Sequence, residues 1–316
     1  MAKQIITLYH AGQKLITKDQ QALGKKNVST GEAVDDLTLF DAASMTKTVF
    51  SVLALKMVDQ GLIDLDTPLY TYWPYPDIQH DDRYKRITAR MVLSHTSGFP
   101  NLRYLNDKGE YNPDAKLRLM FEPGAAFLYS GEGYLYLAKV IAHMKGIELN
   151  DFQALFKNEI FDQLNMKHSA VVWSNYVQTH RAHGHLKGSL HKGWSINASN
   201  PNFHPAHSLQ SNAFDFALFL DALITNKLLS KESHEALLSI QTVSPATPSQ
   251  KERSYGLGIV IEPSAKRTFY LHGGNNLSAT SKYRFDLDNR RGYVFFLNSE
   301  HQQSFDEHLV QFLSGD

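Results

Sequence analysis

The sequence predicts an α/β (α+β) protein whose antiparallel β-sheet, flanked by helices, comes from both ends of the chain, with an inserted, mostly helical domain. Runs of β-branched and aromatic residues occur near both ends, which is typical of short strands. The middle of the chain carries helical patterns separated by loops rich in Pro, Gly, Asn and His. A length of 316 residues allows two domains. We expect the sheet domain at 1–65 and 214–316, and the helical domain at 66–213.

The first two strands are predicted at Ile5–Tyr9 and Lys14–Thr17. They flank Ala11-Gly12, and this glycine can take the positive φ of a tight turn. We therefore expect a β-hairpin at the start of the chain.

Four further strands are predicted after residue 250, because β-branched and aromatic runs alternate there with turn residues. These strands are Gly256–Ile261, Thr268–His272, Ser281–Asp286 and Gly292–Asn298. Together with the hairpin they predict a sheet built from both chain ends.

Three helices are predicted between these strands. Met45–Gln60 is apolar around most of its circumference and is followed by Gly61, so we expect a buried central helix. Tyr134–His143, followed by Gly146, and Asn150–Gln163 also show helical patterns.

Composition excludes several classes of function. Lys plus Arg equals Asp plus Glu at 32 each, which gives no reason to expect nucleic acid or an anionic membrane as a partner. The absence of cysteine excludes thiolate catalysis and disulfides. Val49–Val58 is too short and too polar to cross a bilayer, and no secretion signal is visible at the N-terminus, so we expect a soluble protein without a membrane span.

Ser44 and Lys47 lie at the predicted start of the central helix and allow two interpretations. Spaced three residues apart, they face the same side, so Lys47 could act as the base for a Ser44 nucleophile if burial lowers its pKa. Alternatively, Ser44 is an ordinary helix N-cap, since Ser-x-x-Lys recurs by chance. The pair alone does not decide between these interpretations.

Two downstream segments add to the pair. Tyr129 lies just before the helix predicted at Tyr134–His143, and His272-Gly273-Gly274-Asn275 ends a predicted strand with small residues. With these segments the chain resembles the serine β-lactamase and penicillin-binding protein superfamily, in the branch of class C β-lactamases, D-amino-acid peptidases and related esterases. The matching blocks, in chain order, are Leu39–Lys47, Gly61–Asp66, Ile87-Thr88, Leu93–Gly98, Glu122–Gly124, Tyr129-Ser130, Ser211–Asp215 and Tyr255–Gly258.

The resemblance implies a β-lactamase/transpeptidase-like fold and a role for each matching residue. Ser44 matches the nucleophile that forms the acyl-enzyme, Lys47 the lysine beside it, and Tyr129 the tyrosine that exchanges protons with serine and leaving group. The backbone N–H groups of Ser44 and Asn275 would form the oxyanion hole, worth a few kcal/mol per donor. His272, Gly273 and Gly274 would complete the substrate edge.

Departures from the family pattern bear on the substrate. Gly131 replaces the asparagine of Tyr-x-Asn, and His272-Gly273-Gly274 replaces Lys-Thr-Gly. These changes remove groups that would hold the amide and carboxylate of a β-lactam, so esterase or peptidase activity is favoured over β-lactamase activity. Relatives also begin with a helix before the first strand, whereas here the strand comes first, so that helix is either absent or removed.

Histidines form the other conspicuous pattern, and His183-x-His185 could offer two nitrogens to a metal. No acidic residue lies between Arg181 and Phe214, so we favour a polar loop and predict neither metal nor cofactor. The histidines of this segment are His180, His183, His185, His191, His204 and His207. The resemblance implies that His95 holds a loop through backbone hydrogen bonds rather than acting in catalysis.

Aromatic side chains are the last candidates for the site. They line a substrate cleft or belong to the core, and sequence leaves both alternatives open. The aromatic residues in question are Trp73, Tyr75, Tyr104 and Trp194.

The sequence therefore predicts a serine hydrolase that acts on a small ester, amide or peptide through an acyl-enzyme on Ser44. Two alternatives stay open. The first is a penicillin-binding, β-lactamase-type or peptide-binding member of the fold with weak turnover. The second is a metal-dependent hydrolase built on the histidines between 180 and 207.

Overall fold

The fold is known from a computed structural model, which describes residues 2–11, 14–103, 112, 114–194, 196–246, 251–300, 306 and 309. The chain divides into two compact units. The first, called the sheet unit, comprises Met1–Val49, Asn150–Leu228 and Glu262–Asp316. The second, called the helical unit, comprises Phe50–Leu149 and Leu229–Ile261.

These units group residues by proximity, and their limits do not coincide with the predicted domain limits. The boundary falls within helix α1 (Thr46–Asp59), whose first turn belongs to the sheet unit and whose remainder belongs to the helical unit. A domain is a segment that could fold alone, which is a different property from proximity. The predicted domains at 1–65 with 214–316 and at 66–213 therefore stay a prediction.

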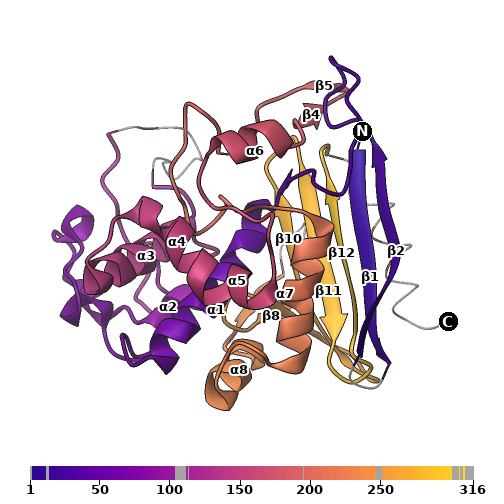
Figure 1. The fold of residues 1–316 in the computed structure, drawn as a ribbon. Coiled ribbons are helices and arrows are strands. Elements are labelled where there is room, and N and C mark those ends of the chain that lie inside the picture. The colour runs from indigo at the N-terminus through magenta and orange to yellow at the C-terminus, as the bar shows by residue number, and fades with distance from the viewer. Residues whose placement is uncertain are drawn as a thin grey trace. The chain divides into compact units, whose positions relative to one another are not determined.

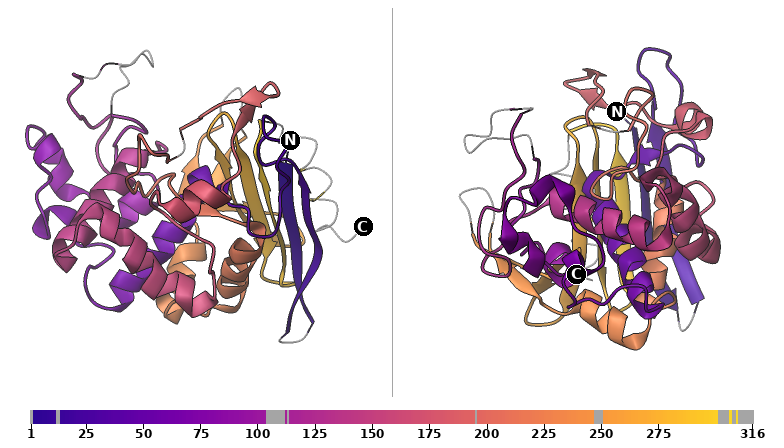
Figure 2. Two further views of the ribbon diagram at one scale, coloured as in Figure 1. Left: turned by 45° about the horizontal axis from the view of Figure 1, so that its top comes forward. Right: turned by 90° about the vertical axis from the view of Figure 1, so that its left-hand side faces the viewer.

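Antiparallel strands from both ends of the chain form the sheet unit. Within it the strand order is β2-β1-β12-β11-β10. Tyr9 pairs with Arg291 and Lys3 with Leu297, so the first and the last of these strands in the sequence lie side by side (Figures 1 and 2). The strands are β1 (Ala2–Ala11), β2 (Lys14–Gly24), β10 (Thr268–Asn275), β11 (Thr280–Asp286) and β12 (Arg291–Leu297).

The prediction of an antiparallel sheet from both chain ends is thus confirmed. β1 pairs with β2 in antiparallel register, as the predicted hairpin requires. Gly12 lies outside the described residues. The three last predicted strands correspond to β10, β11 and β12, with ends shifted by up to three residues.

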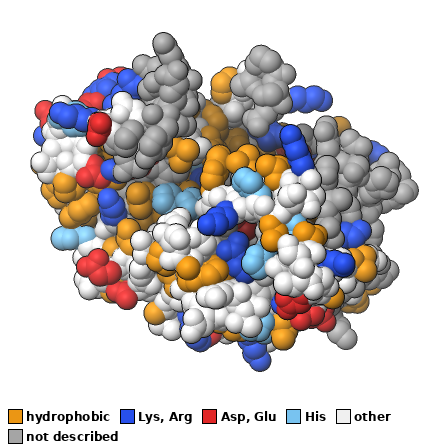
Figure 3. Space-filling model, turned by 90° about the horizontal axis from the view of Figure 1, so that it is seen from above, with side chains coloured by type: hydrophobic (Ala, Val, Ile, Leu, Met, Phe, Trp, Pro, Cys, Tyr) orange, Lys and Arg blue, Asp and Glu red, His pale blue; other side chains and the backbone are white. Residues whose placement is uncertain are grey.

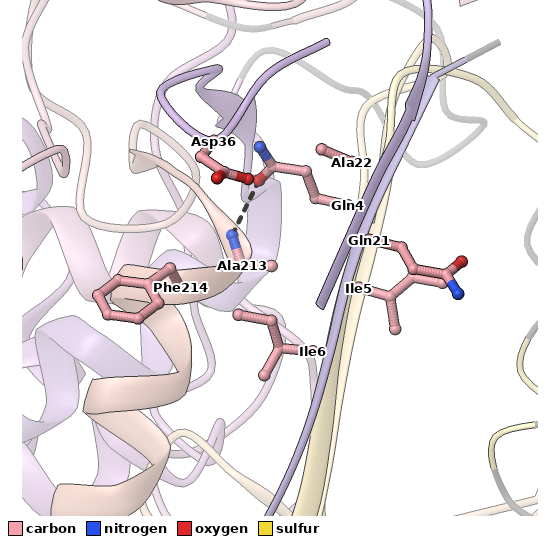
Figure 4. A pocket seen from close by; sticks show the side chains of 8 residues that line it. All are labelled: Gln4, Ile5, Ile6, Gln21, Ala22, Asp36, Ala213 and Phe214. Carbon is pink, nitrogen blue, oxygen red and sulfur yellow. Dashed lines mark hydrogen bonds between the residues drawn. The ribbon is translucent and has the colours of Figure 1, made fainter. Parts of the chain in front are cut away.

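Helices of the sheet unit cover one face of these strands. α7 contacts β1, β11 and β12, and ten of its thirteen residues are buried. Its first turn is tied to the sheet, because the Ala213 backbone N–H donates to Gln4 Oε1 over 3.1 Å (Figure 4). The helices are α4 (Phe152–Phe156), α5 (Asp162–Leu164), α6 (Asn175–His180) and α7 (Ala213–Thr225), with the short helices η5 (Leu149–Asp151) and η6 (Lys157–Phe161).

Short strands complete the sheet unit. β3 pairs with β6, which places Asp41 opposite Gln210, and β4 pairs with β5. Their bounds are β3 (Phe40–Asp41), β4 (His185–Leu186), β5 (Ser189–Leu190) and β6 (Gln210–Ser211).

The helical unit contains most of α1, which is buried along nearly its whole length, as predicted from its apolar circumference. Its other helices are α2 (Ala89–Leu93), α3 (Gly131–Lys145), α8 (Lys231–Leu238), η2 (Leu69–Thr71), η3 (Pro76–Ile78) and η4 (Asp82–Arg86). Its strands are β7 (Thr242–Ser244), β8 (Arg253–Tyr255) and β9 (Val260–Pro263), the last of which crosses the unit boundary.

One predicted strand is wrong over most of its length. Of Gly256–Ile261, only the last two residues belong to a strand, because the segment from Gly256 to Ile259 connects β8 to β9. Gly258 has φ +77°, which a strand does not allow, and a Cβ there would lie 2.1 Å from Ser51 Oγ. Gly258 therefore allows this segment to pack closely against α1, and it does not belong to a paired strand.

The two other predicted helices are present. Tyr134–His143 lies within α3, and Gly146 caps that helix. Asn150–Gln163 corresponds to η5, α4, η6 and α5, where η6 is a π-helical turn within the helical stretch. π-Helical turns widen the helix locally and occur mostly as single turns.

Candidate active site

Ser44 lies in a tight connection between strand and helix. β3 ends at Asp41, and the 3₁₀ turn η1 (Ala43–Met45) leads directly into α1. Ala43 has φ +44°, a left-handed conformation that costs energy for a residue with a Cβ. The Ala43 backbone N–H donates to Asp41 Oδ1 over 2.9 Å, which helps to hold this conformation. The bend leaves Ser44 partly exposed between buried neighbours.

Lys47 lies one turn further on and is buried, with 2% of its surface exposed. Its Nζ donates to the Ala206 carbonyl oxygen over 3.0 Å and lies 3.5 Å from Ser44 Oγ. Burial lowers the pKa of Lys47 to about 7, because a charged ammonium loses hydration inside the protein. Burial therefore favours the neutral amine, the form that can accept a proton.

The alternative that Ser44 is an ordinary helix cap finds no support in this geometry. Ala42, not Ser44, occupies the N-cap position of η1. The Ser44 hydroxyl faces the amine of Lys47 instead.

β10 packs closely against the turn that carries Ser44, and Gly274 makes this approach possible. A Cβ on Gly274 would lie 2.2 Å from the Ala42 carbonyl oxygen and 3.0 Å from the Ala43 Cβ. β10 contacts η1 directly. A larger residue at 274 would therefore push the strand or the turn out of place.

Polar contacts join the same turn to β11 and to the end of β10. Ser281 Oγ donates to the Ala42 carbonyl oxygen over 2.9 Å. The buried Asn276 donates from its Nδ2 to Asp41 Oδ2. Asp41 thus fixes both Ala43 before the nucleophile and Asn276 after the predicted substrate edge.

The predicted residues of the substrate edge occupy the second half of β10. His272 is buried, and its Nδ1 lies 2.8 Å from the Gly273 carbonyl oxygen. Asn275 is exposed at the end of the strand, and its Oδ1 accepts from the Leu277 N–H over 2.8 Å. The sheet unit therefore brings Ser44 and Lys47 together and places β10 beside them. The oxyanion-hole roles stay a prediction.

Two histidines lie near Lys47 that the sequence analysis had assigned to a polar loop. The rings of His204 and His207 stack with centroids 4.3 Å apart, and Ala206 between them supplies the carbonyl that binds Lys47. Burial, together with the charge of Lys47, lowers the pKa of His207 to about 4. His207 is therefore neutral at neutral pH and adds no second cation beside Lys47.

Tyr129 belongs to the helical unit, where it stacks on His95 with ring centroids 4.3 Å apart. His95 holds the segment from both sides of Tyr129. Its carbonyl accepts from the Leu128 N–H over 2.8 Å, and its Nδ1 accepts from the Ser130 N–H over 3.1 Å. The prediction that His95 holds a loop is confirmed. The proton-transfer role of Tyr129 stays a prediction.

Gly131, where the family has asparagine, starts α3. Its backbone N–H donates to Asn101 Oδ1 over 3.0 Å. The next residue, Glu132, is buried and accepts hydrogen bonds from Arg103 Nε over 3.1 Å and from the Tyr75 hydroxyl over 2.7 Å.

The aromatic candidates divide between core and surface. Tyr75 is fully buried and stacks on Tyr136, so it belongs to the core. Trp73 packs against both rings, whereas Trp194 has 61% of its surface exposed. Tyr104 lies outside the described residues.

The histidines between 180 and 207 do not form one cluster. His180 stacks on Tyr176, His185 is buried beside Asn298, and His183 and His191 line a separate pocket. In the part of the chain that the structure describes, no three side chains of His, Cys, Asp or Glu are grouped as a metal site requires.

Sequence reasoning missed three partners of the nucleophile segment: Ala206, Asp41 and Asn276. Ala206 acts through its backbone carbonyl, which carries no residue-type signal. Asp41 lies inside a segment that the resemblance had matched, and Asn276 directly follows another, but their contact joins positions 235 residues apart. No local pattern could have found them.

Fold and site together give a partly exposed serine at a strand-to-helix turn, with a buried lysine one helical turn later whose amine lies 3.5 Å from the serine hydroxyl. The chain belongs to the β-lactamase family of serine hydrolases, whose family model ("Beta-lactamase") matches residues 7–312. The resemblance inferred from the sequence is thereby confirmed.

Similar proteins include penicillin-binding proteins of Bacillus subtilis. The chain is 25% identical over 257 residues to the putative penicillin-binding protein PbpX, covering 78% of this chain and 60% of that protein. It is 23% identical over 304 residues to penicillin-binding protein 4*, covering 87% and 64% respectively. The chain thus spans less than two thirds of the length of these relatives.

Solved structures show the same fold. The octameric penicillin-binding protein homologue from Pyrococcus abyssi superimposes with a TM-score of 0.80 at 21% identity, covering 100% of this chain and 74% of that one. D-amino acid amidase from Ochrobactrum anthropi gives 0.73 at 20% identity, covering 95% and 86%. The predicted fold class is confirmed. In the described ranges, no helix is both long and apolar enough to span a bilayer.

Proposed function

We propose that the protein hydrolyses small esters, amides or peptides through an acyl-enzyme on Ser44. In the first step, neutral Lys47 accepts the Ser44 hydroxyl proton while Oγ attacks the carbonyl carbon. The tetrahedral intermediate collapses, and its leaving group departs with the proton that Lys47 had accepted. Water then attacks the acyl-enzyme, which releases the acid and regenerates Ser44.

The observation that carries this proposal is the buried amine beside the serine. With a pKa near 7, Lys47 is matched to proton transfer at neutral pH, where an exposed lysine would be almost fully charged. His207, whose pKa is lowered to about 4, is neutral in this pH range, so burial is what lowers the pKa of Lys47.

The site chemistry favours esters and small amides over β-lactams. Gly131 and Gly273 offer no side chain to a substrate, and the family lysine of the edge strand is replaced by His272. These positions lack the amide and ammonium groups that would hold the amide and carboxylate of a β-lactam.

A substrate panel tests the proposal. It contains p-nitrophenyl acetate and octanoate, the p-nitroanilides of D-alanine and D-phenylalanine, and a chromogenic cephalosporin. We expect turnover of at least one ester or anilide and at most slow turnover of the cephalosporin. Ser44→Ala should abolish turnover, with a loss of about 10³-fold or more, and also labelling by a fluorophosphonate.

Ser29→Ala is the matched control, because Ser29 is an exposed serine in the same unit. It should keep full activity and labelling. Fluorophosphonate labelling of Ser44→Ala at another serine would show that the nucleophile is assigned wrongly.

A second candidate function is binding of penicillin or of peptidoglycan-like peptides with little turnover. The names of the Bacillus subtilis relatives favour it, since both are penicillin-binding proteins. Intact-protein mass spectrometry after incubation with benzylpenicillin separates the two functions. A stable adduct on Ser44 combined with no ester turnover would support binding and contradict our proposal.

A further inference from the structure

A pocket in the sheet unit has no part in the proposed reaction. It has a volume of about 520 Å³, which lies in the range of small-molecule sites. Its walls come from the segment around α6 and from the loop after β5. The residues that line it are Trp173, Gln178, Arg181, His183, Gly184, Leu190, His191, Lys192, Asn197, Ala198 and Ser199.

The pocket is basic. Arg181 and Lys192 carry positive charge, His183 and His191 line the same space, and none of the described lining residues is acidic. Figure 3 looks at the molecule from the side where Figure 1 places α6 and the β4–β5 hairpin. It shows lysine, arginine and histidine side chains interspersed with hydrophobic ones on that face.

Arg181 is the group best placed to hold a ligand. One guanidinium nitrogen, NH1, donates to the Ile196 carbonyl oxygen over 2.8 Å, which orients the side chain. Its Nε is buried and has no hydrogen-bond partner among the described residues. A buried N–H without an acceptor is costly, so a ligand oxygen at this position would stabilise the site.

The charge of Arg181 is not neutralised by a direct ion pair in the described structure. Burial lowers the pKa of Arg181, and the negative charge of Asp41 only partly opposes this. The Asp41 carboxylate already accepts hydrogen bonds from Ala43 and Asn276. Glu32, the acid that acts on His183, forms an ion pair with Lys26 over 2.6 Å.

The pocket also has an apolar wall. The Arg181 guanidinium lies 5.3 Å from the ring centroid of Trp173, and Leu190 and Ala198 line the same space. A ligand that fits must therefore combine an anionic group with a flat or apolar body.

The pocket wall rests on the turn that follows the predicted substrate edge. A Cβ on Gly193 would lie 2.5 Å from Ser278 Oγ and 2.7 Å from the Asn276 carbonyl oxygen, so this loop packs tightly on the turn between β10 and β11. Asn276 in turn binds Asp41, three residues before Ser44. Packed contacts thus connect the pocket to the nucleophile segment within one unit.

We propose that this pocket is a second binding site, separate from Ser44, for a small carboxylate with an aromatic or apolar body. Arg181 binds the carboxylate through its guanidinium, and Trp173, Leu190 and Ala198 contact the body of the ligand. The site does not depend on the proposed hydrolytic function, because it shares no residue with the proposed catalytic machinery.

Isothermal titration of the full chain with 2-naphthoate and with the neutral 2-naphthamide tests this proposal. We expect saturable binding of 2-naphthoate at least tenfold tighter than that of the amide. Arg181→Gln should weaken 2-naphthoate binding tenfold or more, the usual scale for loss of a charge-assisted hydrogen bond. Equal affinity for the two compounds, or unchanged binding by Arg181→Gln, would overturn the proposal.

Three further variants make the result specific. Lys187→Gln removes an exposed cation from the neighbouring β4–β5 turn, outside the pocket lining, and should bind normally. Ala198→Trp fills the pocket without changing its charge and should abolish binding, which keeps the test decisive if Arg181→Gln does not fold. Ser44→Ala should bind like the wild type. Loss of binding in Ser44→Ala would place the ligand at the proposed active site and contradict a second site.

Discussion

Lys47 and Glu132 are two buried charged side chains in comparable sequence positions. Lys47 follows Ser44 by three residues, and Glu132 follows Tyr129 by three residues. Their exposed fractions are 2% and 4%. Their environments nevertheless differ, and this difference separates a group suited to chemistry from a group suited to stability.

The Lys47 amine contacts two neutral groups, the Ser44 hydroxyl and the Ala206 carbonyl. Burial therefore dominates and lowers the pKa to about 7. Glu132 instead forms an ion pair with Arg103. Burial by itself would lower the pKa of Arg103, but the hydrogen bond and the negative charge of Glu132 have the larger effect, so the pKa of Arg103 is raised. Burial thus makes the Lys47 amine a better proton acceptor, whereas the ion pair stabilises the charged form of Arg103.

Lys47→Arg gives the largest expected effect on this comparison. Arginine keeps the positive charge but stays protonated, so it cannot accept the Ser44 proton. We expect kcat/KM for p-nitrophenyl acetate to fall by about 10³-fold or more. Lys56→Arg, a half-buried lysine on the same helix, is the control and should keep activity within about twofold. Activity of Lys47→Arg within tenfold of the wild type would show that Lys47 is not the base.

Glu132→Gln tests the other side of the comparison. Glutamine carries no negative charge, so the positive charge of the largely buried Arg103 loses one of its counter-charges. We therefore expect the free energy of unfolding to fall by about 3 kcal/mol. Urea denaturation measures it. Glu235→Gln breaks an exposed pair with Lys231, at 3.8 Å, and should cost at most about 0.5 kcal/mol. Equal losses for the two variants would remove the distinction between Glu132 and a surface charge.

The pH dependence of acylation tests the pKa of Lys47 directly. In the proposed reaction the neutral amine of Lys47 is the active form, so kcat/KM should rise about tenfold per pH unit below pH 7 and level off above it. His207, with a pKa of about 4, stays neutral over this range, so its titration should not add a second inflection to the pH–rate profile. The pH–rate profile of Glu132→Gln should have the same midpoint as that of the wild type. A rate that continues to rise to pH 10 would mean that Lys47 has the pKa of an ordinary exposed lysine.

His95→Asn gives the smallest expected effect. Asparagine tolerates the left-handed backbone of residue 95, where φ is +61°, but is too short to accept from the Ser130 N–H. We expect a loss of about 1 kcal/mol in the free energy of unfolding and a modest fall in kcat as the Tyr129 segment loosens. His80→Asn, at an exposed position of the same unit, is the control. Abolished activity with unchanged stability would give His95 a catalytic role.

Some elements of the fold could be predicted because their signal is local. The all-round apolar character of Met45–Gln60 predicted a buried helix, and α1 is one. The strands near both ends were predicted from β-branched and aromatic runs. The strand at Gly256–Ile261 was predicted wrongly because Gly258 packs closely against Ser51, a residue about two hundred positions earlier in the sequence.

The sequence by itself determined the family, the strand and helix pattern, and the spacing of Ser44 and Lys47. Only the tertiary structure decided that Lys47 is buried beside the Ala206 carbonyl, that Asp41 binds Asn276, and that Gly274 lets β10 approach the nucleophile turn. The reason is physical. Side-chain spacing on a helix follows from local geometry, but burial, pKa and close approach depend on groups that the chain brings together from distant positions.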